Sequence, residues 1–217
     1  MFEFMEGSIY AIYIPMIKFM IGTACRCSEM TGLTWEDVDM KERTISINHQ
    51  LIYKVMDGQT RYVFHEPKTK KGKRVIPMTR DVYDALHEQK KLQLALGTFC
   101  NEEVCGLKGF VFTNRNARPI ISGNVNDILR RLVNKCNENE RKKAENEGRE
   151  ARELPHISAH TLRHTGCTRM AECGVDVKTL QYIMGHESIE TTMNIYNHVD
   201  TARVAVEIQK MDKIKIG

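Results

Sequence analysis

The strongest constraint on the fold is a change of sequence pattern from helical to β-forming and back to helical. Residues 8–31 place apolar side chains at helical spacing, and Gly22 is a candidate break between two helices. The segments that follow are rich in Ile, Val, Tyr and Phe, and they cover 44–55, 62–65 and 74–78. This pattern predicts a small antiparallel sheet of three strands between helical parts.

The rest of the chain is predicted to be mainly helical. Thr79 is a candidate N-cap for a helix that ends near Leu96, and Ser122 begins another that reaches about Asn137. Residues 139–153 mix acids and bases with almost nothing apolar, which predicts a solvated linker or an exposed helical extension. Three further helices are predicted, with starts at Ser158, Asp176 and Ser188 and stops at Gly174 and Gly185.

The composition fits one α+β domain. The 217 residues, 41% of them hydrophobic, can bury one core, and two smaller domains are the alternative. Seven cysteines without a Cys-x-x-Cys pair indicate free thiols, as in a reducing cytoplasm, rather than a zinc ribbon or disulfide framework. The apolar run 9–21 is interrupted by Lys18, so it predicts a core helix and not a signal peptide or membrane span. A net charge of +4 suits nucleic-acid binding and an ordinary soluble protein equally.

A histidine and an arginine are predicted on one helical face. His160 and Arg163 are three residues apart, so a helix presents them together, an arrangement that suits a phosphate group. A solvated helix face would have the same spacing. His160 and His164 also have the spacing of two zinc ligands, with His156 or His186 as the third. However, the residue after His160 is not the glutamate base of zinc proteases.

Two basic features lie earlier in the chain. Arg26 interrupts a run of apolar and small residues, and a buried arginine needs an anionic partner, for which Glu29 has helical spacing. An intrahelical ion pair without further function is the alternative. Segment 68–74 lies between two predicted strands, and five of its seven residues are basic. A β-hairpin tip with this charge would attract the DNA backbone, although a solubilising turn has the same composition.

A tyrosine follows the second predicted helix stop. Gly185 closes one helix, and His186 lies in the turn behind it. Tyr196 comes ten residues after His186, in the next predicted helix, between Asn194 and Asn197. A helical tyrosine is usually half-buried packing, but these polar neighbours favour an exposed phenol.

Taken in order, these residues resemble the tyrosine recombinase (phage integrase) family, and most of all the integrases of conjugative transposons. The resemblance runs from about Tyr10 to His198, and it departs from the family where Ala24 replaces a frequent glycine. It rests on Arg26 with Glu29 and Leu33-x-Trp35 after it, a lysine in a β-hairpin, His160-x-x-Arg163, and Gly185-His186 with Tyr196 ten residues later. It implies a mostly α-helical α+β catalytic domain with a small three-stranded antiparallel sheet.

The resemblance also implies the catalytic set Arg26, Lys68, His160, Arg163, His186 and Tyr196. Tyr196 would attack the phosphate, with His160 as base and Lys68 as acid for the leaving oxygen. The two arginines and His186 would bind the phosphate oxygens, supported by Glu29, so no metal ion or other cofactor is expected. The other basic residues of the loop are assigned to DNA contact, the lysines also as alternates for the acid: Lys70, Lys71, Lys73 and Arg74.

The implied partner is double-stranded DNA at recombination sites, cleaved and rejoined through a 3′-phosphotyrosine to integrate or excise a mobile element. The protein would act in the bacterial cytoplasm on nucleoid DNA, as a tetramer in the synaptic complex, with accessory DNA-bending or excision factors and no membrane partner. Residues 1–217 would be the catalytic domain without the N-terminal core-binding and arm-binding domains, and the tail 199–217 would dock on a neighbouring subunit. The alternatives are a type IB topoisomerase-like relaxing enzyme and a catalytically inactive DNA-binding module.

Overall fold

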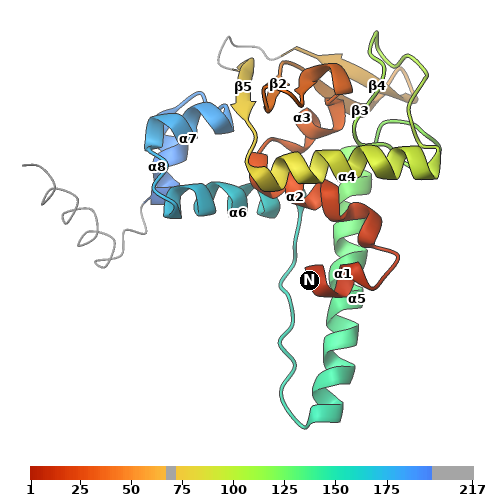
Figure 1. Cartoon of the computed structure of the whole chain (residues 1–217), viewed down its shortest axis with the longest axis vertical. Helices are drawn as coiled ribbons and strands as arrows, with labels where there is room; N and C mark the ends of the chain where they lie inside the picture. Colours follow the sequence, from red (N-terminus) through yellow and green to blue (C-terminus); the bar gives the residue numbers. More distant parts are fainter. Residues whose placement is uncertain (67–71, 197–217) are drawn as a thin grey trace, which may run out of the picture.

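The computed structural model describes residues 1–66 and 72–196, in which helices pack beneath and beside two small sheets (Figure 1). The helices are α1 (Phe2–Glu6), α2 (Ile14–Thr23), α3 (Cys27–Gly32), α4 (Arg80–Leu96), α5 (Ser122–Glu147), α6 (Ala159–Glu172), α7 (Val177–Met184) and α8 (Ile189–Tyr196). The strands are β1 (Val38–Asp39), β2 (Thr44–Ile47), β3 (Gln50–Met56), β4 (Gln59–His65) and β5 (Arg74–Pro77). Within the described ranges, no helix is long and apolar enough to cross a membrane.

The strands form two sheets. Strands β1, β2 and β5 make an antiparallel three-stranded sheet with β2 in the middle, so that Ile45 lies opposite both Val38 and Ile76. Strands β3 and β4 form a separate hairpin. A three-stranded sheet was predicted, but its strands differ, because the predicted strand 44–55 is divided into β2 and β3, which belong to different sheets. Ile45 of β2 lies in the main core, while Leu51 of β3 lies in a second cluster with Phe110.

The basic segment 68–74 was predicted to be the tip of a β-hairpin, and this prediction is wrong. The segment joins β4 of one sheet to β5 of the other, and β4 pairs with β3 in the described residues. Lys68, Lys70 and Lys71 lie outside the described residues.

Helix α2 lies at the centre of the main core. Its residues Ile17, Phe19 and Met20 are fully buried. A Cβ atom on Gly22 would collide with Val82 of α4, and one on Gly166 of α6 would collide with the α2 backbone. These glycines let both helices approach α2 closely. Gly22 is thus a packing position, and the predicted helix break lies after it, at residue 24.

Most predicted helix boundaries agree with the structure. Side-chain oxygens of Thr79, Ser158 and Asp176 accept hydrogen bonds from backbone N–H groups in the first turns of α4, α6 and α7. Such caps satisfy donors that the helix itself leaves unpaired. Gly185 ends α7 with φ 60°, in the left-handed region that glycine adopts without strain.

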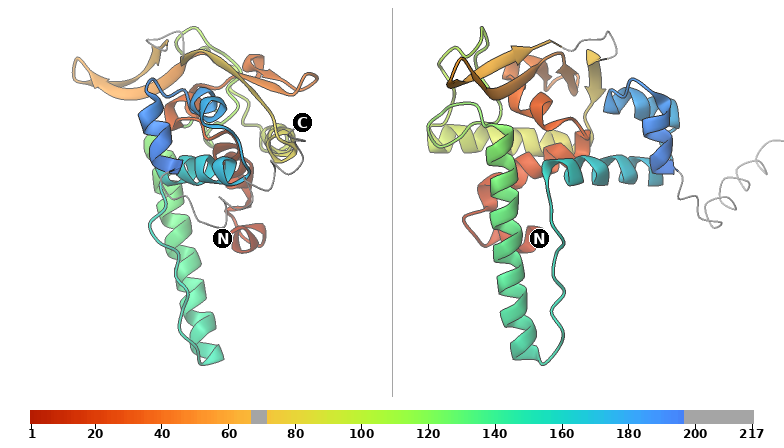
Figure 2. Two further views of the ribbon diagram at one scale, coloured as in Figure 1. Left: turned by 90° about the vertical axis from the view of Figure 1, so that its left-hand side faces the viewer. Right: turned by 180° about the vertical axis from the view of Figure 1, so that it is seen from behind.

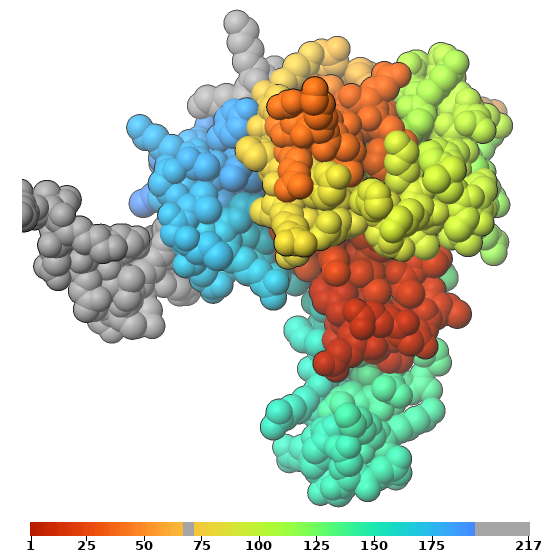
Figure 3. Space-filling model, in the orientation of Figure 1, coloured from red at the N-terminus to blue at the C-terminus, as the bar shows by residue number. Residues whose placement is uncertain are grey.

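Helix α5 is longer than predicted. It continues to Glu147, so the exposed helical extension, one of the two alternatives for 139–153, is correct for its first part. The returning segment is tied to the helix by hydrogen bonds between Asn137 and Leu154 and between Arg141 and Glu153. Figure 2 shows the helix and this segment running side by side away from the sheets, and Figure 3 shows their tip as a separate lobe.

Candidate active site

Arg26 begins helix α3 instead of lying inside a helix. Helix α2 ends at Ala24, which has a left-handed φ of 48°, and Arg26 is the N-cap of α3. The Glu29 carboxylate accepts a hydrogen bond from the Arg26 backbone N–H at 2.8 Å and another from its Nη1 at 3.0 Å. The helix start therefore fixes the side chain of Arg26, which remains 37% exposed.

Glu29 is shared between two arginines. Arg74 donates Nη1 and Nη2 to the two Glu29 carboxylate oxygens at 3.0 and 2.8 Å, and both side chains are buried. Burial alone would raise the pKa of Glu29, but the hydrogen bonds and charges of Arg74 and Arg26 hold it below its ordinary value. Glu29 is therefore an anion that neutralises part of the arginine charge.

The prediction that Arg74 contacts DNA is wrong. Its side chain is 0% exposed, because it points into the molecule from β5 on the same face as Ile76. The alternation of buried and exposed residues along a strand is the signal that could have shown this, since Val75 and Pro77 take the exposed face.

Arg163 is buried on helix α6. It donates Nη1 to the Ala24 carbonyl at 2.6 Å and Nη2 to the Met184 carbonyl at 2.7 Å. Burial, together with the charge of Arg26, lowers the pKa of Arg163 to about 10, so the guanidinium stays charged at neutral pH.

His186 is a neutral acceptor. Its Nε2 lies 3.0 Å from Arg163 Nη2, and because an arginine can only donate, Nε2 must carry the lone pair. The ring proton is then on Nδ1, which donates to Thr192 Oγ1 at 3.0 Å. Burial and the charges of Arg163, Arg26 and Arg74 lower the pKa of His186 to about 4.

Three arginines converge on consecutive carbonyl groups at the end of α7. The last carbonyls of a helix have no intrahelical partner and carry partial negative charge, so guanidinium groups satisfy them well. Arg74 Nε donates to Ile183, Arg163 Nη2 to Met184, and Arg26 Nη2 to Gly185, at 2.7, 2.7 and 2.8 Å. These bonds fix the turn that carries His186.

The remaining predicted residues lie around this cluster. His160 is exposed on α6, three residues before Arg163, and its Nε2 lies 2.8 Å from that of His164. Tyr196 is the last residue of α8, one helical turn after Thr192. Lys73 is exposed and pairs with Glu66. In the part of the chain that the structure describes, no three His, Cys, Asp or Glu side chains form a group that could hold a metal ion.

The cluster is suited to an anionic phosphate. Three guanidinium charges less the Glu29 carboxylate leave an excess of two positive charges beside the neutral His186. A phosphodiester attacked by a phenolate passes through a pentacoordinate state with two negative charges. Arg26 uses two of its five N–H donors on the described residues, so the others can reach an oxygen at the surface.

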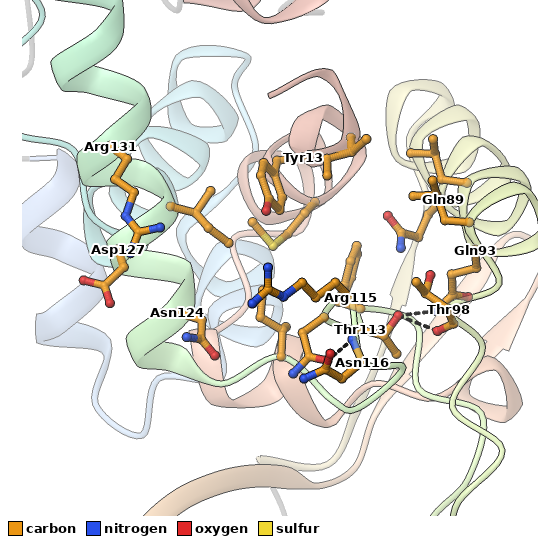
Figure 4. A pocket seen from close by; sticks show the side chains of 18 residues that line it. Tyr13, Gln89, Gln93, Thr98, Thr113, Arg115, Asn116, Asn124, Asp127 and Arg131 are labelled. Atoms are coloured by element: carbon orange, nitrogen blue, oxygen red, sulfur yellow. Dashed lines mark hydrogen bonds between the residues drawn. The ribbon is translucent and has the colours of Figure 1, made fainter. Parts of the chain in front are cut away.

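A cavity of about 660 Å³ lies elsewhere, between α2, α4, α5 and the turn at 113–116 (Figure 4). The amides of Gln89 and Gln93 at its wall already donate to backbone carbonyls. None of the candidate site residues lines it, so it is separate from the arginine cluster.

Comparisons with known proteins show the family to which this chain belongs. The model of the phage integrase family matches residues 1–203. The transposase from transposon Tn916 of Enterococcus faecalis is 35% identical over 199 residues, which are 92% of this chain and 45% of that protein. The Tn1549 transposon integrase in complex with circular intermediate DNA has a TM-score of 0.81 at 32% identity, over 97% of this chain and 63% of that one. The chain thus spans less than half the length of the curated relative named here.

Proposed function

Because this chain belongs to the phage integrase family, we propose that it carries the catalytic site of a site-specific DNA recombinase that integrates or excises a mobile element. The observation that carries the proposal is the convergence of Arg26, Arg163 and His186 at the end of α7, with an excess of positive charge. The similar proteins are named transposase and integrase, which favours recombination over the topoisomerase-like alternative and over an inactive DNA-binding module.

In this mechanism, Arg26 and Arg163 bind the non-bridging oxygens of the scissile phosphate and stabilise the pentacoordinate state. Tyr196 attacks the phosphorus and remains bonded to the 3′ phosphate. Its free pKa is near ~10, so it needs a base, for which His160 is the candidate. Lys68 protonates the leaving 5′ oxygen. The phosphotyrosine keeps the energy of the phosphodiester, so that a new 5′ hydroxyl can be joined without ATP.

The proposed partner is double-stranded DNA at the ends of a mobile element. Solved structures of the Tn1549 integrase hold transposon right end DNA and circular intermediate DNA, which supports this choice. Strand exchange joins two duplexes, so a tetramer in the synaptic complex, with accessory DNA-bending or excision factors, is part of the proposal. The Tn916 transposase comes from a bacterium, and the site of action would be nucleoid DNA in the cytoplasm.

The test is trapping of a covalent adduct on nicked, site-containing DNA, resolved on a denaturing gel. The wild-type chain should form the adduct, also in the presence of a chelator, because arginines rather than a metal ion stabilise the phosphate. Tyr196→Phe should form none, while DNA affinity and melting temperature stay unchanged, because only a hydroxyl is lost. Tyr53→Phe, on the β3–β4 hairpin, is the matched control and should behave as wild type.

Two results would contradict the proposal. One is an adduct that persists in Tyr196→Phe and maps to another tyrosine such as Tyr182. The other is activity that disappears with chelator and returns with magnesium or zinc.

A further inference from the structure

The guanidinium of Arg74 contacts both halves of the candidate active site. Its Nη1 and Nη2 donate to Glu29, and its Nε donates to the Ile183 carbonyl at 2.7 Å. A further bond from Nη1 reaches the Gly72 carbonyl. We propose that Arg74 is a positioning residue for DNA cleavage: it fixes the position of Arg26 relative to the turn that carries His186. This inference rests on the proposed recombinase function.

The link to Arg26 runs through the shared carboxylate. Glu29 Oε1 accepts from Nη1 of both arginines, and Oε2 accepts from Arg74 Nη2 and the Arg26 backbone N–H. Without Arg74, the buried carboxylate of Glu29 would keep only its hydrogen bonds from the backbone N–H and the side chain of Arg26 among the four described here. A carboxylate free to rotate would then draw the Arg26 side chain inward and weaken its grip on the phosphate.

The link to His186 runs through the end of α7. The Ile183 carbonyl is the first of the three that the arginines hold, and Gly185 lies directly against the Arg74 guanidinium. A Cβ atom on Gly185 would lie 2.8 Å from Arg74 Nη1, so the turn and the guanidinium are in close contact. Arg74 therefore connects strand β5 to the turn that presents His186.

The contacts of Arg74 require an arginine. Its planar group makes four hydrogen bonds with three partners, which lie on β5's own loop, α3 and α7. A lysine ammonium keeps the charge but cannot span these directions. Because the side chain is 0% exposed, Arg74 does not reach the phosphate itself and acts through Glu29 and Ile183.

The experiment compares Arg74→Lys with Arg118→Lys, an arginine in an exposed ion pair with Glu102. Single-turnover adduct formation is measured at saturating DNA, and DNA affinity is measured separately. We expect Arg74→Lys to slow adduct formation at least tenfold and to leave the dissociation constant for DNA within twofold of wild type. The control should change neither. If the wild-type chain forms no adduct, the proposed function is contradicted, and the inference falls with it. If the wild-type chain forms the adduct and Arg74→Lys forms it equally fast, only the inference is contradicted.

A second variant separates positioning from stability. Glu29→Gln with Arg74→Gln removes one positive and one negative charge together, so the excess of two positive charges is unchanged and no carboxylate loses its partner, and the pair should fold even if Arg74→Lys does not. This pair should melt near the wild-type temperature and still cleave at least tenfold more slowly. The inference is overturned if the folded pair cleaves at the wild-type rate. It is also overturned if Arg74→Lys cleaves normally, or weakens DNA binding without slowing the saturated reaction.

Discussion

At the scale of single residues, the site places a neutral histidine among permanent charges. His186 accepts from Arg163 because burial and the surrounding arginines disfavour its protonation. A bound phosphate would offset those charges and raise the pKa of His186, which could then donate to a phosphate oxygen. We therefore expect the protonation state of His186 to depend on whether phosphate is bound.

This arrangement predicts how stability depends on pH. The folded pKa of His186 is lowered from 6.5 to about 4, so between these values the unfolded chain binds a proton that the folded chain excludes. The stability is fully present above about pH 6.5 and is lost as the pH falls toward 4. His186→Asn should therefore show a smaller drop in melting temperature between pH 7.5 and pH 5 than wild type. Equal drops would show that burial and the neighbouring charges do not lower the pKa of His186 in the folded chain.

The choice of the general acid is also a question about one residue. Lys68→Ala should cleave normal DNA slowly but a 5′-bridging phosphorothioate at nearly the wild-type rate, because sulfur leaves without a proton. Lys70→Ala and Lys71→Ala are the matched controls, and the ratio of their cleavage rates on the two substrates should equal the wild-type ratio. If either control shows the rescue instead, that lysine is the acid.

At the scale of elements, the site depends on how closely α6 approaches α2. Gly166 faces the Ile21 carbonyl, one turn after Arg163 on α6, so the same contact brings Arg163 to the Ala24 carbonyl. Close packing of backbone on backbone leaves no room for a side chain at this position.

Gly166→Ala should push α6 away from α2 and separate Arg163 from Ala24. Overpacking of this kind costs about 1–3 kcal/mol. In a chain of this size each kcal/mol lowers the melting temperature by roughly 2–4 °C. Gly123→Ala on α5 is the control, because its Cβ meets nothing within 4 Å, and it should be neutral or slightly stabilising. A Gly166→Ala variant with wild-type melting and cleavage would contradict the packing argument.

At the scale of the whole molecule, the proposed tetramer on DNA needs contacts between subunits, and the candidate for such a contact is the tail 199–217. This tail lies outside the described residues. Val204, Ile208 and Met211 recur in its sequence at spacings of four and three, which predicts one apolar helical stripe, and the alternation at 214–216 predicts a strand that would add to a neighbour's sheet. We propose that this tail docks on a neighbouring subunit.

Deletion after Asp200 should then spare the melting temperature and weaken cooperative complexes on site DNA, measured by light scattering. A large fall in melting temperature with complexes of unchanged size would show that the tail packs on its own domain.

The sequence by itself determined the local features of this protein. The caps at Thr79, Ser158 and Asp176 and the stop at Gly185 depend on neighbours within a few residues, so a sequence window contains all the atoms involved. The order and spacing of Arg26, Arg163 and Tyr196 likewise indicated the family that the comparisons show.

Only the tertiary structure decided which of these charges meet. Arg74 and Glu29 are 45 residues apart, and the strand alternation that could place Arg74 on a buried face does not say which carboxylate it meets there. The separation of β3 and β4 from the other strands goes with two apolar clusters, one that contains Ile45 of β2 and one that contains Leu51 of β3. Such contacts join segments that are far apart in the chain, so no local sequence pattern predicts them. An arginine usually lies in solvent, and the fold allows Arg74 to be buried because it supplies the Glu29 carboxylate as a partner.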